Sequence, residues 1–74
     1  MTGRGMRLTI NGKIESFDQD SIRLSDYLSS KGIHPSTVAV ELNLTVLDKS
    51  RYADTLLKEG DEVEIVRFVG GGAA

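Results

Sequence analysis

Seventy-four residues without a single Cys make one small domain with a marginal core, and they exclude disulfides, thiolate metal sites and a thiol nucleophile. Nine Lys and Arg against eleven Asp and Glu give a formal net charge of −2, which lacks the basic excess that nucleic-acid binding requires. The chain has no signal-peptide pattern and no apolar run near the ~18 residues of a membrane span, so we expect a cytoplasmic protein that binds neither membrane nor nucleic acid.

A β-hairpin is predicted near the start of the chain. Residues 6–10 and 13–17 alternate apolar and polar side chains, as half-buried strands do. Asn11-Gly12 lies between them, and this pair favours a type I′ turn because both central residues need a positive φ. Residues 1–5 precede the hairpin, and we expect them to form a disordered extension.

One short helix is predicted after the hairpin. Its apolar side chains recur at i, i+3 and i+4, at Leu24, Tyr27 and Leu28. Gly32 suits the position just after the helix, where a left-handed residue closes the last turn. Asp20 and Ser21 are the two candidate caps for its start, although neither has Glu or Gln three residues later.

The second half of the chain predicts three more strands. Residues 37–42 form a mostly buried apolar run, residues 46–47 a brief strand, and residues 62–69 the last strand. We expect a single helical turn over residues 49–52 and a turn within residues 56–61.

These elements predict an α+β fold with one exposed sheet face. A single main helix cannot cover both faces of a mixed sheet of four to five strands, so it packs on one face. Alternation along the last strand directs Val63 and Ile65 toward the helix. It directs Glu64, Val66 and Phe68 away from the helix. We expect Val66 and Phe68, together with Val69, to form a docking patch for a partner protein.

A glycine run lies near the end of the chain, and the last residues are Gly70, Gly71, Gly72, Ala73 and Ala74. Glycine has no Cβ, so an extended run of it fits a channel too narrow for other residues. We expect residues 70–74 to be flexible. The residues alone leave two interpretations open: a frayed end, or a main-chain carboxylate presented to another protein's active site.

Side chains offer few candidates for chemistry. His34 is the single histidine and precedes Pro35 in a predicted loop, with no carboxylate nearby. Tyr27 and Tyr52 are expected to pack at the edge of the core, and Asp61 to stabilise its turn. The sequence therefore predicts no catalytic side chain and no metal site.

The chain resembles the ThiS family of thiamin-biosynthesis sulfur carriers, within the wider ThiS/MoaD superfamily. The segments that carry the resemblance follow one another in family order, as Val38-Ala39-Val40-Glu41-Leu42-Asn43, Leu57-Lys58-Glu59-Gly60-Asp61, Val63-Glu64-Ile65-Val66 and Phe68-Val69-Gly70-Gly71-Gly72. The resemblance runs from Met6 to Gly72. It implies a ubiquitin-like β-grasp domain over residues 6–69.

The resemblance implies a carrier protein rather than an enzyme. Its terminal glycine, Gly72, would be adenylated by an E1-like, ThiF-like partner that uses ATP and Mg²⁺, while the chain itself binds no cofactor. Gly70 and Gly71 would form the stem that enters the partner's channel. Sulfur would then replace AMP, and the thiocarboxylate would donate sulfur to a ThiG-like thiazole synthase.

Three features depart from the family pattern. Ala73 and Ala74 follow Gly72, so a peptidase trims them, the partner accepts them, or the terminus has diverged. Residues 1–5 precede the usual family start near Met6. Leu44 stands where the family often has Gly, which predicts a different turn after Asn43.

Other functions stay open at this stage. The small subunit of molybdopterin synthase has the same fold and terminal chemistry, and related carriers serve cysteine synthesis. A binding module resembling the TGS domain is the alternative of another class, because that domain's Gly-Asp-x-Val-Glu-Ile segment is similar to residues 60–65.

Overall fold

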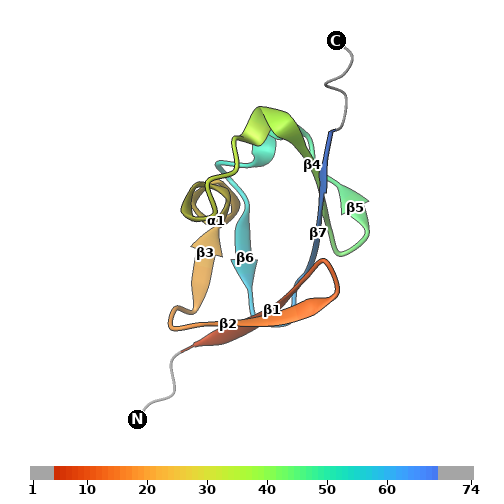
Figure 1. The fold of residues 1–74 in the computed structure, drawn as a ribbon. Helices are drawn as coiled ribbons and strands as arrows, with labels where there is room; N and C mark the ends of the chain where they lie inside the picture. Colours follow the sequence, from red (N-terminus) through yellow and green to blue (C-terminus); the bar gives the residue numbers. More distant parts are fainter. Residues whose placement is uncertain (1–4, 69–74) are drawn as a thin grey trace.

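A computed structural model describes residues 5–68 as two β-sheets and one α-helix around a common core (Figure 1). The strands are β1 (Met6–Ile10), β2 (Lys13–Phe17), β3 (Ser21–Arg23), β4 (Val38–Leu42), β5 (Thr45–Val46), β6 (Leu56–Lys58) and β7 (Glu62–Arg67). The helical segments are α1 (Leu24–Ser30) and two short 3₁₀ turns, η1 (Pro35–Thr37) and η2 (Lys49–Arg51).

The main sheet has five strands in the order β2-β1-β7-β4-β5. The β1–β7 pair is parallel and the other pairs are antiparallel, so the sheet is mixed. Strands β3 and β6 form a separate two-stranded sheet. This architecture confirms the predicted α+β fold with a five-stranded mixed sheet and one main helix, and it adds the small second sheet.

The predicted hairpin is confirmed with its bounds. Asn11 has φ +51° and Gly12 has φ +84°, the left-handed geometry that a type I′ turn requires. The Asn11 side chain also ties the turn to β7, because its Oδ1 accepts from the Ile65 N–H at 2.7 Å. Its Nδ2 donates to the Ile65 carbonyl at 3.3 Å. Asn11, which identified the turn in the sequence, thus also helps to hold β1 and β7 in register.

The helix is confirmed, but both predicted caps are wrong. The N-cap is Arg23, which makes no side-chain capping bond. Asp20 and Ser21 cannot cap because the chain stays extended through Arg23 while β3 pairs with β6. Gly32 follows the helix with φ +71°, and its N–H donates to the Ser29 carbonyl at 3.0 Å, as predicted for the closing residue.

The core lies between α1 with β3 and β6 on one side and the main sheet on the other (Figure 1). Side chains from every strand except β2, β3 and β5 are fully buried in it, and the helix contributes the predicted apolar face. The buried residues are Met6, Leu8, Ile10, Leu24, Tyr27, Leu28, Val38, Val40, Tyr52, Leu57 and Val63.

Three boundaries in the second half of the chain differ from the predictions. Thr37 belongs to η1 and not to the strand. The predicted turn before Glu62 is confirmed at Glu59-Gly60, but Leu56–Lys58, which precede it, form strand β6. Strand β7 ends at Arg67, while Val69 lies outside the described residues. The brief strand is confirmed one residue earlier, as Thr45–Val46, and the helical turn is confirmed as Lys49–Arg51, one residue shorter than predicted.

The expectation of a different turn after Asn43 is wrong. Asn43 has φ +52° and Leu44 has φ +72°, so two consecutive left-handed residues join β4 to β5. Leu42 pairs with Thr45 across this two-residue turn. Leu44 therefore adopts the backbone conformation that a glycine would adopt, because the hairpin geometry requires it.

Candidate functional site

Two of the three predicted docking residues, Val66 and Phe68, lie on the face of the main sheet that the helix leaves uncovered. Val66 is 57% exposed and Phe68 is 52% exposed, whereas Val63 is buried and Ile65 packs against the core. This confirms the assignment of the two faces of β7 from alternation. The docking role of Val66 and Phe68 stays a prediction.

Phe68 is fixed to the body of the protein although its ring is half exposed. Its N–H donates to the Thr37 carbonyl at 2.9 Å, which extends the β4–β7 pairing past the last strand residue. The ammonium group of Lys49 lies 4.8 Å from the centroid of its ring, a cation–π contact. The last residue that the structure describes is therefore held at a defined position on the body, with its aromatic ring half exposed.

The predicted chemistry of the tail falls on residues that the structure does not describe. Val69 lies there, and so do the stem, the proposed reactive glycine and the two alanines, namely Gly70, Gly71, Gly72, Ala73 and Ala74. Their assignments stay predictions. What the structure gives is the position from which they continue, after Phe68.

The uncovered face extends beyond the three β7-side residues that alternation placed on it, Glu64, Val66 and Phe68. Val66 pairs with Ala39 on β4, Glu64 pairs with Glu41, and Glu41 pairs on its other side with Val46 of β5. Val46 is 68% exposed. Sequence reasoning missed Ala39, Glu41 and Val46, because only strand register brings them beside β7.

Asp61 holds the turn that begins β7, as predicted. Its carboxylate is buried and accepts from the Lys58 N–H and from the Asn43 side-chain amide, both at 3.0 Å. The Asn43 Oδ1 in turn accepts from the Glu62 N–H at 2.9 Å. These bonds tie the β4–β5 turn to the start of β7 and so fix how the two strands line up.

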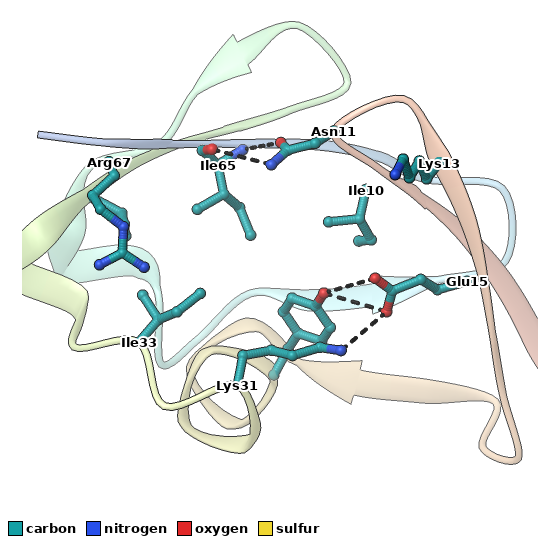
Figure 2. Close-up of a pocket in the computed structure, with 10 residues that line it drawn as sticks. Ile10, Asn11, Lys13, Glu15, Lys31, Ile33, Ile65 and Arg67 are labelled. Atoms are coloured by element: carbon teal, nitrogen blue, oxygen red, sulfur yellow. Dashed lines mark hydrogen bonds and ion pairs between the residues drawn. The ribbon is translucent and has the colours of Figure 1, made fainter.

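A cavity of about 450 Å³ lies on the opposite, inner face of the sheet, between β7 and the end of α1 (Figure 2). Aliphatic side chains of Ile10, Ile33 and Ile65 line it, and Lys13 and Arg67 stand at its two ends. No His, Ser or Cys is among its lining residues. The cavity therefore lacks a nucleophile–base pair of the Ser–His or Cys–His type.

Glu15 joins two other side chains at the edge of this cavity (Figure 2). The Tyr27 hydroxyl lies 3.3 Å from each of its carboxylate oxygens, and the Lys31 ammonium lies 3.6 Å from one of them. Burial, together with the negative charge of Glu15, raises the pKa of Tyr27 to about 12. The phenol is neutral at physiological pH and packs at the core edge, as predicted.

The remaining candidates for chemistry have structural roles. His34 is exposed in its loop, and its Nδ1 accepts from the Ser36 N–H at 3.2 Å to cap η1. Tyr52 is buried and donates to the Val38 carbonyl at 3.4 Å. Within residues 5–68, no group of three His, Cys, Asp or Glu side chains is placed to hold a metal ion. No helix in that range is long and apolar enough to cross a membrane.

Comparison with known proteins gives consistent matches across the chain. The model of the ThiS family matches residues 5–72. The crystal structure of the thiamine biosynthesis protein ThiS from Geobacter metallireducens is 39% identical with a TM-score of 0.79, covering 90% of this chain and 100% of that chain. The sulfur carrier protein ThiS of Bacillus subtilis is 38% identical over 65 residues, which cover 88% of this chain and 98% of that protein.

A thiazole synthase is also similar. The enzyme of Paramagnetospirillum magneticum is 41% identical over 68 residues, which cover 92% of this chain. The chain spans only 21% of that enzyme's length. The similarity therefore concerns one small segment of the synthase.

Proposed function

This chain belongs to the ThiS family, and from that membership we propose that it is a sulfur carrier protein of thiamin biosynthesis. The family resemblance and the ubiquitin-like β-grasp fold that it implied are confirmed. The observation that carries the function is the match along 98% of a sulfur carrier protein, because a shared fold alone would not identify an activity. The named relatives are thiamin proteins, which favours thiamin over molybdopterin or cysteine synthesis.

The chemistry of the carrier resides in its main-chain terminus. A carboxylate is a poor electrophile, so we propose that an E1-like enzyme joins the Gly72 carboxylate to the α-phosphate of ATP with loss of pyrophosphate. AMP is then a good leaving group, and a sulfur nucleophile displaces it to give the thiocarboxylate. The activating enzyme supplies ATP, Mg²⁺ and a site that excludes water. The carrier supplies a terminal segment long enough to bring its carboxylate into that site, and within this segment Gly70 and Gly71 form a stem without side chains.

The acceptor that we propose is a thiazole synthase. A segment similar to 92% of this chain forms part of the P. magneticum enzyme, which supports close cooperation between the two activities. We place the carrier in the cytoplasm, where ATP and both enzymes are available. Because the reactive carboxylate must belong to glycine, the proposal also requires a peptidase that removes Ala73 and Ala74.

Mass spectrometry tests this proposal. A chain that ends at Gly72 and the chain of residues 1–74 are each incubated with an E1-like adenylating enzyme, ATP and Mg²⁺. We expect the Gly72-ended chain to gain the mass of one adenylyl group, and the longer chain to stay unmodified until it is trimmed. If the Gly72-ended chain gains no mass, the carrier function is wrong.

A cellular assay separates the carrier from a TGS-like binding module. A variant without Gly71 and Gly72 should fail to support growth in the absence of thiamin, because it has no glycine terminus to activate. Full growth with that variant would favour the binding module.

A further inference from the structure

Two carboxylates face each other on the outer surface of the main sheet. Glu64 of β7 and Glu41 of β4 are direct partners in the antiparallel register, and alternation places both side chains on the uncovered face. Opposite side chains in such a pair have Cβ atoms roughly 4.5–5.5 Å apart, and like charges at that separation repel. Within residues 5–68, no ion pair of either carboxylate with a Lys or Arg is found.

Apolar side chains border this acidic pair, and those of Val46, Val66 and Phe68 are exposed. Val66 and Ala39 form the adjacent register pair toward the tail, and Val46 lies beside Glu41 on the other side. Phe68, the last residue that the structure describes, follows the end of β7 at Arg67. We call this surface the outer-face patch; its members are Ala39, Glu41, Val46, Glu64, Val66 and Phe68.

We propose that the outer-face patch docks a protein whose contact surface carries one Arg or Lys between apolar side chains, with the cation seated between Glu41 and Glu64. The inference rests on the proposed function, in which that protein is the adenylating enzyme. The charge complementarity is specific, because one cation converts a repulsive pair into two attractive contacts. An arginine suits the position best, since its planar fork donates to two carboxylates at once.

The same pair discriminates between partners. Docking removes the patch from water, and a partner without a cation at this position would bury two like charges with no counter-charge. An apolar surface alone, such as that formed by Val66 and Phe68, would accept many partners. The acidic pair therefore restricts binding at this apolar surface to partners that carry a basic side chain at the matching position.

The proposal predicts opposite effects on stability and on binding. Glu64→Gln preserves the shape of the side chain and removes the repulsion in the free carrier, so its Tm should equal or exceed that of the parent. The same change removes half of the cation's binding site, so its Kd for the adenylating enzyme should rise at least tenfold. A residue that merely supports the fold would lower Tm.

Calorimetric titration with the adenylating enzyme tests both effects. Glu64→Gln, Glu41→Gln and the double variant are compared with the parent, all ending at Gly72, and the loss of affinity should shrink as salt screens the interaction. Asp18→Asn is the matched control, because it removes one negative charge from an exposed turn far from the patch. Its Kd should equal that of the parent.

Each other outcome has a defined meaning. If the parent binds and is adenylated but the Glu→Gln variants bind equally well, the patch proposal is wrong and the carrier function stands. A lower Tm in the variants also overturns it, since the pair would then be structural. Self-association of the parent that the variants lose would assign the patch to a second copy. A parent that is never adenylated overturns the proposed function itself.

Discussion

Leu44 occupies a backbone conformation that suits glycine better than leucine. Its φ is +72° and its side chain is 84% exposed, so little burial offsets the strain. A left-handed residue with a Cβ costs about 1–2 kcal/mol, whereas glycine in an ordered turn costs roughly 0.5–1 kcal/mol of extra chain entropy. We therefore expect Leu44→Gly to raise the free energy of unfolding by about 0.5 kcal/mol, as measured by urea denaturation.

Leu44→Ala is the control for this prediction. It removes the same exposed apolar atoms but keeps the Cβ, so its stability should stay close to that of the parent. A loss of stability in Leu44→Gly would show that the leucine makes packing contacts that outweigh the strain of its backbone.

Tyr27 gives the protein a specific dependence on alkaline pH. Its pKa is raised from 10.0 to about 12 in the folded state, so the folded protein retains the phenolic proton that the unfolded chain loses first. The resulting stabilisation is fully present below pH 10 and is lost as pH rises toward 12. We expect the advantage of the parent over Tyr27→Phe to shrink across this window in chemical denaturation at several pH values. A constant difference between the two proteins would contradict the shift.

At the scale of elements, α1 begins without a side-chain cap. Arg23 is at the N-cap with φ −71° and ψ 138°. The N–H groups of Leu24 and Ser25 already donate to the Thr55 and Tyr52 carbonyls, so an Asp at this position would accept from the third N–H of the helix, that of Asp26. The positive end of the helix dipole also favours a negative charge there. We expect Arg23→Asp to raise the free energy of unfolding by about 1 kcal/mol, as measured by urea denaturation. Arg23→Ala, which cannot cap, should show no such gain.

The elements with local signals were predictable, and those that depend on distant pairing were not. The hairpin followed from Asn11-Gly12 between two alternating segments, and the end of the helix followed from Gly32. Strands β3 and β6 were missed because they are three residues each and pair with residues 35 positions away, as in Ile22 with Leu57. The same pairing explains why the helix begins later than the local caps suggested.

In the candidate site too, the features set by local sequence were predictable, and those set by strand register were not. Alternation along β7 gave the exposure of Val66 and Phe68, because the period of a strand is local. The acidic pair was not predictable, since Glu41 and Glu64 are 23 positions apart and meet only through the register of β4 with β7. Register depends on the Asn43–Asp61 and Asn11–Ile65 bonds, which join segments far apart in the sequence.

The whole molecule joins the described body, residues 5–68, to the residues that we propose carry the chemistry. Phe68 is the last residue that the structure describes; its N–H donates to the Thr37 carbonyl, and its side chain belongs to the outer-face patch. When a partner docks on the patch, Phe68 therefore has a fixed position relative to that partner. Residues 69–72 then span at most about 13 Å, so the distance from the patch to the partner's catalytic centre is set by residue count.

The length of the tail should therefore control reaction rate without controlling docking. Deletion of Gly71 from the Gly72-ended chain keeps a terminal glycine but shortens the reach by about 3.3 Å, and a 1 Å misplacement of reacting groups costs about 10²-fold in rate. We expect at least a tenfold slower adenylation at saturating carrier, with Kd for the adenylating enzyme and Tm close to those of the parent. Quenched-flow mass spectrometry gives the rate, and calorimetry gives the affinity. Adenylation at the parent rate would show that the partner's channel adapts to the shorter chain. The position of Phe68 would then not determine where the terminal glycine lies in the partner's active site.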